Sequence, residues 1–133
     1  MTSKVTYLGD LRTSSIHLQS GSEIISDAPL DNNGKGEAFS PTDTVANALA
    51  SCMFTIMGIK ARDLKVDLST STANVTKIMN VEPRRIGAIK IEFDMHSTVD
   101  DKTKVILERT AMTCPVFLSL HPDIEKKISF NWK

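Results

Sequence analysis

The sequence predicts an α+β domain, because strand-like segments lie before and after one long apolar helical segment instead of alternating with helices. Short stretches of alternating polar and apolar residues come first, a helical pattern follows Ser40-Pro41, and strand patterns then resume. A chain of 133 residues, 41% of them hydrophobic, can bury a core without disulfide bonds. We therefore expect a single domain over residues 1–133.

The first segments are typical of short antiparallel strands joined by tight turns. Polar and apolar residues alternate over Lys4–Tyr7 and Ser14–Leu18, and Glu23–Ser26 follows the turn-forming run Ser20-Gly21-Ser22. The run from Asp31 to Gly36 is rich in Asp, Asn and Gly, which indicates a loop.

The long helix is predicted to begin at Ser40-Pro41, with Ser40 as the N-cap and Asp43 in the first turn, where it complements the helix dipole. Apolar side chains recur at helical spacing at Val45, Leu49, Cys52, Ile56 and Ile59. Alanines and methionines widen this stripe until the helix is apolar nearly all round. Such a helix should be central, covered by a sheet on one side and by something else on the other.

Strand patterns return from Lys65 to Ile78 and from Ile86 to Phe93, on either side of a turn that contains Pro83. Asp100-Asp101 predicts the start of a helix that runs to about Met112. Thr113 or Cys114 begins a second short helix, and a closing strand is expected between Ile124 and Trp132.

Composition excludes several classes of function. The chain has 16 basic and 16 acidic residues and 5% aromatics, which is unlike a dedicated nucleic-acid binder. The longest uncharged stretch, Thr44–Ile59, is shorter than a membrane span, and the N-terminus lacks the apolar core of a signal peptide. We expect a cytoplasmic protein with neither a nucleic acid nor a membrane as partner.

The two cysteines are the main candidates for chemistry. Cys52 lies on the apolar stripe, where a free cysteine packs as a small hydrophobic side chain or serves as a nucleophile. Cys114 falls at a predicted helix start, where unpaired N–H groups favour a thiolate. His17, His96 and His121 show no spacing typical of metal ligands, and no cofactor motif is present, so we expect neither a metal nor a cofactor.

Two motifs resemble those of the OsmC/Ohr superfamily of thiol-dependent peroxidases. The run from Ser40 to Cys52, SPTDTVANALASC, is similar to the cysteine helix of the OsmC-like branch, and Thr113–Val116 is similar to its Cys-Pro helix. The resemblance extends over nearly the whole chain. It implies an OsmC-like fold, in which antiparallel sheets wrap around a long central cysteine-bearing helix, and an intertwined homodimer whose partner subunit covers the helix.

The resemblance also implies a reaction. Cys52 would be the peroxidatic thiolate that reduces an organic hydroperoxide, Cys114 would be the resolving thiol that closes an intramolecular disulfide, and an unknown dithiol would reset the pair. Family members use no cofactor. An apolar surround raises the pKa of a cysteine, so Cys52 requires a nearby cation.

The first 59 residues contain only Lys4, Arg12 and Lys35 as cations, which leaves Arg12 or Lys35 to activate Cys52. In the family a glutamate near the helix start orients an arginine. This chain has Asp43 there, about 13 Å along the helix from Cys52. Glu37 in the preceding loop is the alternative carboxylate.

The helix start therefore departs from the family pattern, and Phe117 replaces a serine of the family's Cys-Pro-x-Ser motif. These departures leave a second interpretation open. The chain would then be a non-catalytic protein of the same fold that binds an apolar small molecule at the dimer interface.

Overall fold

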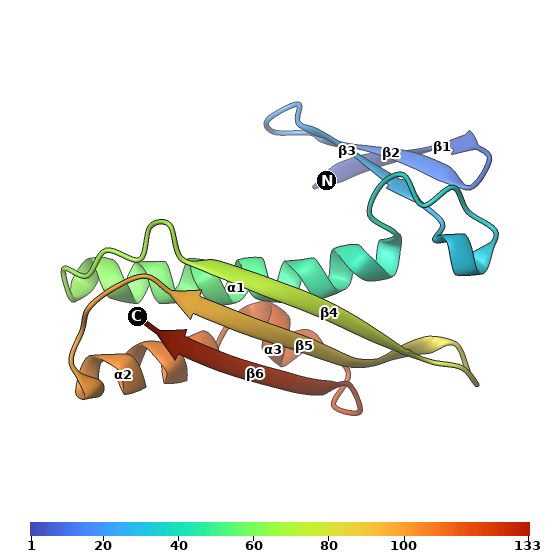
Figure 1. Cartoon of the computed structure of the whole chain (residues 1–133). Coiled ribbons are helices and arrows are strands. Elements are labelled where there is room, and N and C mark those ends of the chain that lie inside the picture. The colour runs from blue at the N-terminus through green and yellow to red at the C-terminus, as the bar shows by residue number, and fades with distance from the viewer. The chain divides into compact units, whose positions relative to one another are not determined.

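The computed structural model describes all residues, 1–133, and has the predicted α+β class, with two small sheets and a long helix (Figure 1). The chain forms two compact units, Met1–Val45 and Ala46–Lys133. The division between them lies inside the long helix α1, which spans Pro41–Asp63.

The first unit contains the antiparallel sheet β1-β2-β3, made of Ser3–Gly9, Arg12–His17 and Glu23–Asp27. This confirms the predicted N-terminal strands, which number three, the larger of the two or three that the pattern allows. A short 3₁₀ turn, η1 (Leu30–Asn32), lies in the predicted loop. The loop returns to the sheet where the backbone N–H of Asp27 donates to the carbonyl of Phe39 at 3.1 Å.

Helix α1 begins where the sequence predicts, and a reciprocal pair of hydrogen bonds fixes its start. The backbone N–H of Asp43 donates to Ser40 Oγ, and the backbone N–H of Ser40 donates to Asp43 Oδ2, both at 3.0 Å. This is a capping box with aspartate in place of glutamate. Ser40 is buried, so its hydroxyl is committed to the helix start.

The second unit contains most of α1 and a sheet of order β4-β5-β6, made of Thr72–Asn80, Arg85–Met95 and Glu125–Trp132. Between β5 and β6 the chain forms helices α2 (Asp101–Ala111) and α3 (Pro115–Ser119). Strands β4 and β5 are antiparallel, but β5 and β6 are parallel. The expectation of wholly antiparallel sheets is therefore wrong for this sheet. The crossover through α2 and α3 returns the chain to the end of the sheet from which β5 starts, as parallel pairing requires.

The core of the second unit lies between one face of this sheet and the helices, with α1 running alongside the strands in Figure 1. Every second residue of the central strand β5 is buried over Ile89–Met95, and the residues between them are exposed or half-buried. Phe93 on β5 lies at the centre of an aromatic group, 4.8 Å from the ring of Phe54 on α1 and 4.9 Å from that of Phe130 on β6. Buried alternate positions explain why the strand pattern was readable from sequence.

The face of α1 that packs on the core differs from the predicted stripe. The buried residues are Ala46, Leu49, Ala50, Met53, Met57 and Ala61. Of the predicted stripe only Leu49 is buried, whereas Val45 and Ile59 are exposed and Cys52 is half-buried. Since both faces of the helix are apolar, periodicity alone did not distinguish the face that the sheet covers.

The strand expected from Lys65 begins only at Thr72. Residues 65–71 form turns instead: Lys65 and Thr70 have positive φ, and Asp67 Oδ1 accepts a hydrogen bond from the backbone N–H of Ser69 at 2.8 Å. Such local side-chain bonds compete with strand pairing.

Helix α1 is also long and apolar enough to cross a membrane by length and composition, a property that core helices of soluble proteins share. In this structure its buried face forms part of the core, which is the ordinary explanation for such a helix.

Candidate active site

The two cysteines belong to the second unit, and both are free. Cys52 lies mid-way along α1 and is half-buried. Cys114 lies at the N-cap of α3 and has 0% exposure. The fold thus presents one reachable thiol and one enclosed thiol.

Local geometry explains the position of Cys114. Helix α2 ends at Ala111, the backbone N–H of Thr113 donates to the carbonyl of Thr110, and Cys114 then takes an extended conformation (φ −65°, ψ 143°). Pro115 occupies the first helical position, which suits a residue without an N–H group. The backbone N–H of Phe117 donates to Cys114 Sγ at 3.2 Å, so the sulfur caps the helix.

The structure brings the two predicted cysteines together, although they are 62 positions apart in the sequence. Cys52 packs against the buried cluster that contains Cys114, and the two thiols lie close enough to interact electrostatically. Burial and this interaction raise the pKa of the Cys114 thiol, whereas the N–H of Phe117 opposes the shift. At neutral pH Cys114 is therefore held as the thiol beside Cys52.

Methionines belong to the same core region as the two cysteines. Met53 and Met57 belong to the same buried cluster as Cys114, and Met112 packs against it together with Cys52. These flexible apolar side chains belong to a core in which a charged thiolate is poorly solvated.

A separate charged cluster lies in the first unit, at the predicted residue Arg12. Its Nε donates to Asp27 Oδ1 at 2.7 Å and its Nη2 donates to Asp27 Oδ2 at 2.8 Å. Glu37 lies farther away, with Oε2 3.7 Å from Arg12 Nη2, and its backbone N–H donates to Asp27 Oδ2 at 3.2 Å. Two parallel hydrogen bonds fix the plane of the guanidinium.

Electrostatics in this cluster favour the charged forms of both partners. The hydrogen bond to Arg12 lowers the pKa of Asp27, and the bond to Asp27 raises the pKa of Arg12. Lys35 adds a weaker Coulombic contribution that also lowers the pKa of Asp27. The carboxylate of Asp27 is 1% exposed, so its charge depends on these partners.

Sequence reasoning missed Asp27. The signal that would have revealed it is strand register: β2 and β3 are antiparallel, and Arg12 pairs directly with Asp27 across the sheet. Opposite charges at directly opposed positions interact. Among the predicted carboxylates, Glu37 lies beside Arg12, whereas Asp43 is engaged in the helix cap.

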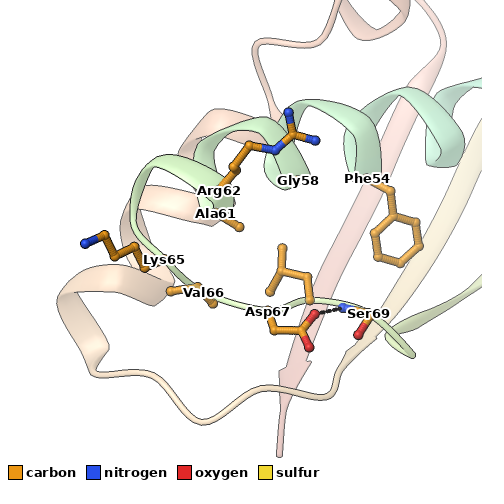
Figure 2. Close-up of a pocket in the computed structure, with 9 residues that line it drawn as sticks. Phe54, Gly58, Ala61, Arg62, Lys65, Val66, Asp67 and Ser69 are labelled. Carbon is orange, nitrogen blue, oxygen red and sulfur yellow. Dashed lines mark hydrogen bonds between the residues drawn. The ribbon is translucent and has the colours of Figure 1, made fainter.

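The structure also contains an open cavity of about 630 Å³ at the C-terminal end of α1, away from the cysteines in the sequence (Figure 2). Phe54, Ala61 and Leu68 line its apolar part. Arg62, Lys65 and Asp67 line its polar part, and the side chains of Arg62 and Lys65 are exposed. No charged group is buried in this cavity, which gives it little selectivity for a ligand.

Comparison with known proteins identifies relatives of this chain. The model of the family described as OsmC-like protein matches residues 34–129. A search of curated proteins gives no match. A crystal structure of a proposed osmotic stress induced and detoxification response protein from Psychrobacter arcticus is 59% identical, with a TM-score of 0.96, over 98% of this chain and 96% of that one.

More distant structures share the fold. An organic hydroperoxide resistance protein OsmC from Legionella pneumophila is 16% identical with a TM-score of 0.72, over 98% of this chain and 97% of that one. The organic hydroperoxide resistance protein OhrB of Bacillus subtilis is 16% identical with a TM-score of 0.66, over 98% of both chains.

Proposed function

This chain belongs to the OsmC-like protein family, and on that premise we propose that it reduces organic hydroperoxides with its two thiols. Cys52 attacks the peroxide, and Cys114 resolves the oxidised product. The observation that carries the proposal is the proximity of the two thiols, one half-buried and one enclosed. Relatives named as organic hydroperoxide resistance proteins support the substrate class.

The chemistry follows from the two sulfurs. The Cys52 thiolate attacks the outer oxygen of ROOH, the O–O bond breaks, and the leaving alkoxide takes a proton to become ROH. Cys52 is then a sulfenic acid. The sulfur of Cys114 displaces its hydroxyl, which leaves as water with the thiol proton, and a disulfide forms. A dithiol finally returns the pair to two thiols while it becomes a disulfide itself.

The enclosed position of Cys114 suits the resolving step. Cys52 packs against the cluster that contains this thiol, so we expect condensation to require little movement of the backbone. Rapid disulfide formation also protects Cys52 from a second hydroperoxide, which would carry it to the irreversible sulfinic acid.

Activation of Cys52 requires a positive charge, and we assign this role to Arg12. Support comes from the bidentate pairing with Asp27, which holds the guanidinium plane while leaving Nη1 without a bond to Asp27. Asp27, with Glu37 beside it, takes the part that a helix-start glutamate has in the family. Asp43 accepts the backbone N–H of Ser40 at the helix start, and lysine at position 35 lacks the planar bidentate geometry of arginine.

We further propose that the protein is a soluble, cytoplasmic homodimer, each chain forming one OsmC-like domain over residues 1–133, without metal or cofactor. Support for the dimer comes from the second apolar face of α1, where Val45 and Ile59 are exposed. Apolar side chains in such a row are typical of a surface that a partner covers.

The test is mass spectrometry of the full-length protein after addition of one equivalent of tert-butyl hydroperoxide. The expected product is a Cys52–Cys114 disulfide, with a loss of two hydrogens from the intact mass. A control protein with a surface thiol is treated in parallel. Oxidation of the control without oxidation of Cys52 would overturn the proposal.

The alternative is a non-catalytic protein that binds an apolar small molecule at the dimer interface. Phe117 favours it, because an apolar ring here replaces the serine of the family's Cys-Pro-x-Ser motif and packs against the core cluster. Its ring centroid lies 5.4 Å from Lys126 Nζ. Two results together would favour this alternative. The wild type would show no peroxidase turnover, and the Cys52→Ser protein would still bind an apolar fluorescent probe.

A further inference from the structure

We propose that the reductant attacks the sulfur of Cys52 and not that of Cys114, so that the resetting dithiol is first linked to Cys52 while Cys114 is released. The inference rests on the proposed function, since it concerns the disulfide which that cycle forms. It specifies which protein sulfur the partner must reach.

Exposure of the two sulfurs is the first argument. Cys52 is half-buried, whereas Cys114 has 0% exposure and belongs to the core cluster with Leu49, Met53 and Ala111. Any hydroperoxide that oxidises Cys52 needs an open path to its sulfur. That path must exist in the proposed dimer as well, where a partner covers the neighbouring face of α1, and it also admits a thiolate. Cys114, in contrast, is enclosed by atoms of its own chain.

The direction of attack is the second argument. In thiol–disulfide exchange the incoming thiolate approaches one sulfur from the side opposite the sulfur that leaves. To attack Cys114, it would have to enter from the side turned away from Cys52. The backbone N–H of Phe117 already contacts Cys114 Sγ at 3.2 Å, and this contact belongs to the first turn of α3. Since Cys114 also has no exposed surface, attack on its sulfur would require the surrounding structure to open.

The step balances as follows. The dithiol HS–R–SH loses one proton to solvent, and its thiolate forms a bond to the Cys52 sulfur as the Cys52–Cys114 bond breaks. Cys114 leaves with the electron pair and takes up a proton. The second thiol of the reductant then loses its proton to solvent and attacks its own linked sulfur, which releases Cys52 as a thiolate and the reductant as a cyclic disulfide.

The environment of Cys114 favours persistence of the intermediate. Burial raises the pKa of this thiol, so Cys114 remains protonated once released. Because only the thiolate attacks a disulfide efficiently, Cys114 seldom displaces the reductant again. The mixed disulfide on Cys52 therefore lasts until the second thiol of the reductant acts.

A monothiol tests the inference, because it cannot complete the second step and leaves its label in place. The full-length protein is oxidised to the disulfide with tert-butyl hydroperoxide, or with diamide in a parallel sample, and exposed to 2-mercaptoethanol. Acid stops the reaction at short intervals, and the freed cysteine is alkylated in denaturant. Trypsin cleaves after Lys35 and Lys60 and after Arg109 and Lys126, so the cysteines fall in different peptides.

We expect at least tenfold more adduct on Cys52 than on Cys114 at the earliest times. The matched control is the same oxidised protein in denaturant, where the preference should fall to about one because access no longer differs. Equal labelling, or a preference for Cys114, in the folded protein would overturn the inference. If only diamide forms the disulfide, the proposed peroxidase function fails while the labelling pattern still decides the inference; if neither oxidant forms it, both fail.

Discussion

Asp27 binds Arg12 through both of its carboxylate oxygens, at 2.7 and 2.8 Å, from the directly opposed position on the neighbouring strand. The carboxylate is almost wholly buried, and a backbone N–H from Glu37 completes its bonding. The Arg12–Asp27 pair therefore connects the start of β2 to the end of β3, and the bond from Glu37 attaches the loop that follows β3.

Replacement of Asp27 by Asn should destabilise the protein and make its thermal stability less dependent on pH in the acid range. The pKa of Asp27 is lowered in the folded state, so its stabilisation is present above the unfolded pKa and is lost as pH falls through the folded one. Thermal melting of the wild type and of Asp27→Asn between pH 3 and 7 measures this stabilisation. The Tm of the wild type should exceed that of the variant at pH 7, and the difference should become smaller as the pH falls. Glu37→Gln is the control, since Glu37 is exposed and 3.7 Å from Arg12; an equal effect of both variants would contradict the assignment.

The two cysteines should respond differently to substitution. Cys52→Ser should consume no tert-butyl hydroperoxide, because it lacks the attacking sulfur. Cys114→Ser should turn over once and then accumulate sulfinic acid on Cys52, because no thiol remains to trap the sulfenic acid. Intact-mass spectra show the added oxygens. Serine retains an N-cap oxygen at position 114, so an unchanged Tm serves as the control for folding.

Disulfide formation should accelerate with pH. Because the pKa of Cys114 is raised, its thiolate fraction at neutral pH is small and increases about tenfold for each pH unit below that pKa. Rapid-quench measurement of the step from Cys52 sulfenic acid to disulfide should give a slope near one between about pH 7 and 8.5. A plateau that starts below pH 8 would show that the folded protein does not hold Cys114 as the thiol.

Removal of the cap at the start of α1 should cost about 1 kcal/mol of unfolding free energy in Ser40→Ala, the usual cost of losing an N-cap. Ser40 Oγ accepts from the backbone N–H of Asp43 at 3.0 Å and is buried, so no water replaces it readily. Urea denaturation followed by circular dichroism measures the change. Thr55→Ala is the matched control, because Thr55 is exposed and bonds only within the helix; a similar loss there would argue against the cap.

The proposed dimer predicts that a charge on the exposed apolar face of α1 is harmful. Ile59→Lys should shift sedimentation from dimer to monomer, since a charged side chain in an apolar interface loses its hydration without a partner. Val81→Lys is the control, because Val81 lies in the turn between β4 and β5 and is more exposed than Ile59. A wild type that sediments as a monomer at micromolar concentration would contradict the dimer.

Local chemistry in the sequence was sufficient for much of the fold. Ser40, Pro41 and Asp43 predicted the start of α1, Asp100 predicted that of α2, and Cys114-Pro115 predicted that of α3. Caps depend on residues within three or four positions of one another, so a single sequence contains the information. The class of the fold followed from the order of these elements.

Tertiary structure decided what depends on contacts between distant residues. In the folded protein the face of α1 around Met53 packs against the sheet, and not the predicted stripe. A helix that is apolar on several sides has more than one face that a sheet can cover, so the sequence does not specify which face is buried. Tertiary structure also set β6 parallel to β5 and opposed Asp27 to Arg12 through strand register. The sequence by itself named Cys52 and Cys114 as the reactive candidates. Only the tertiary fold placed the two side chains near each other and left one partly exposed and the other enclosed.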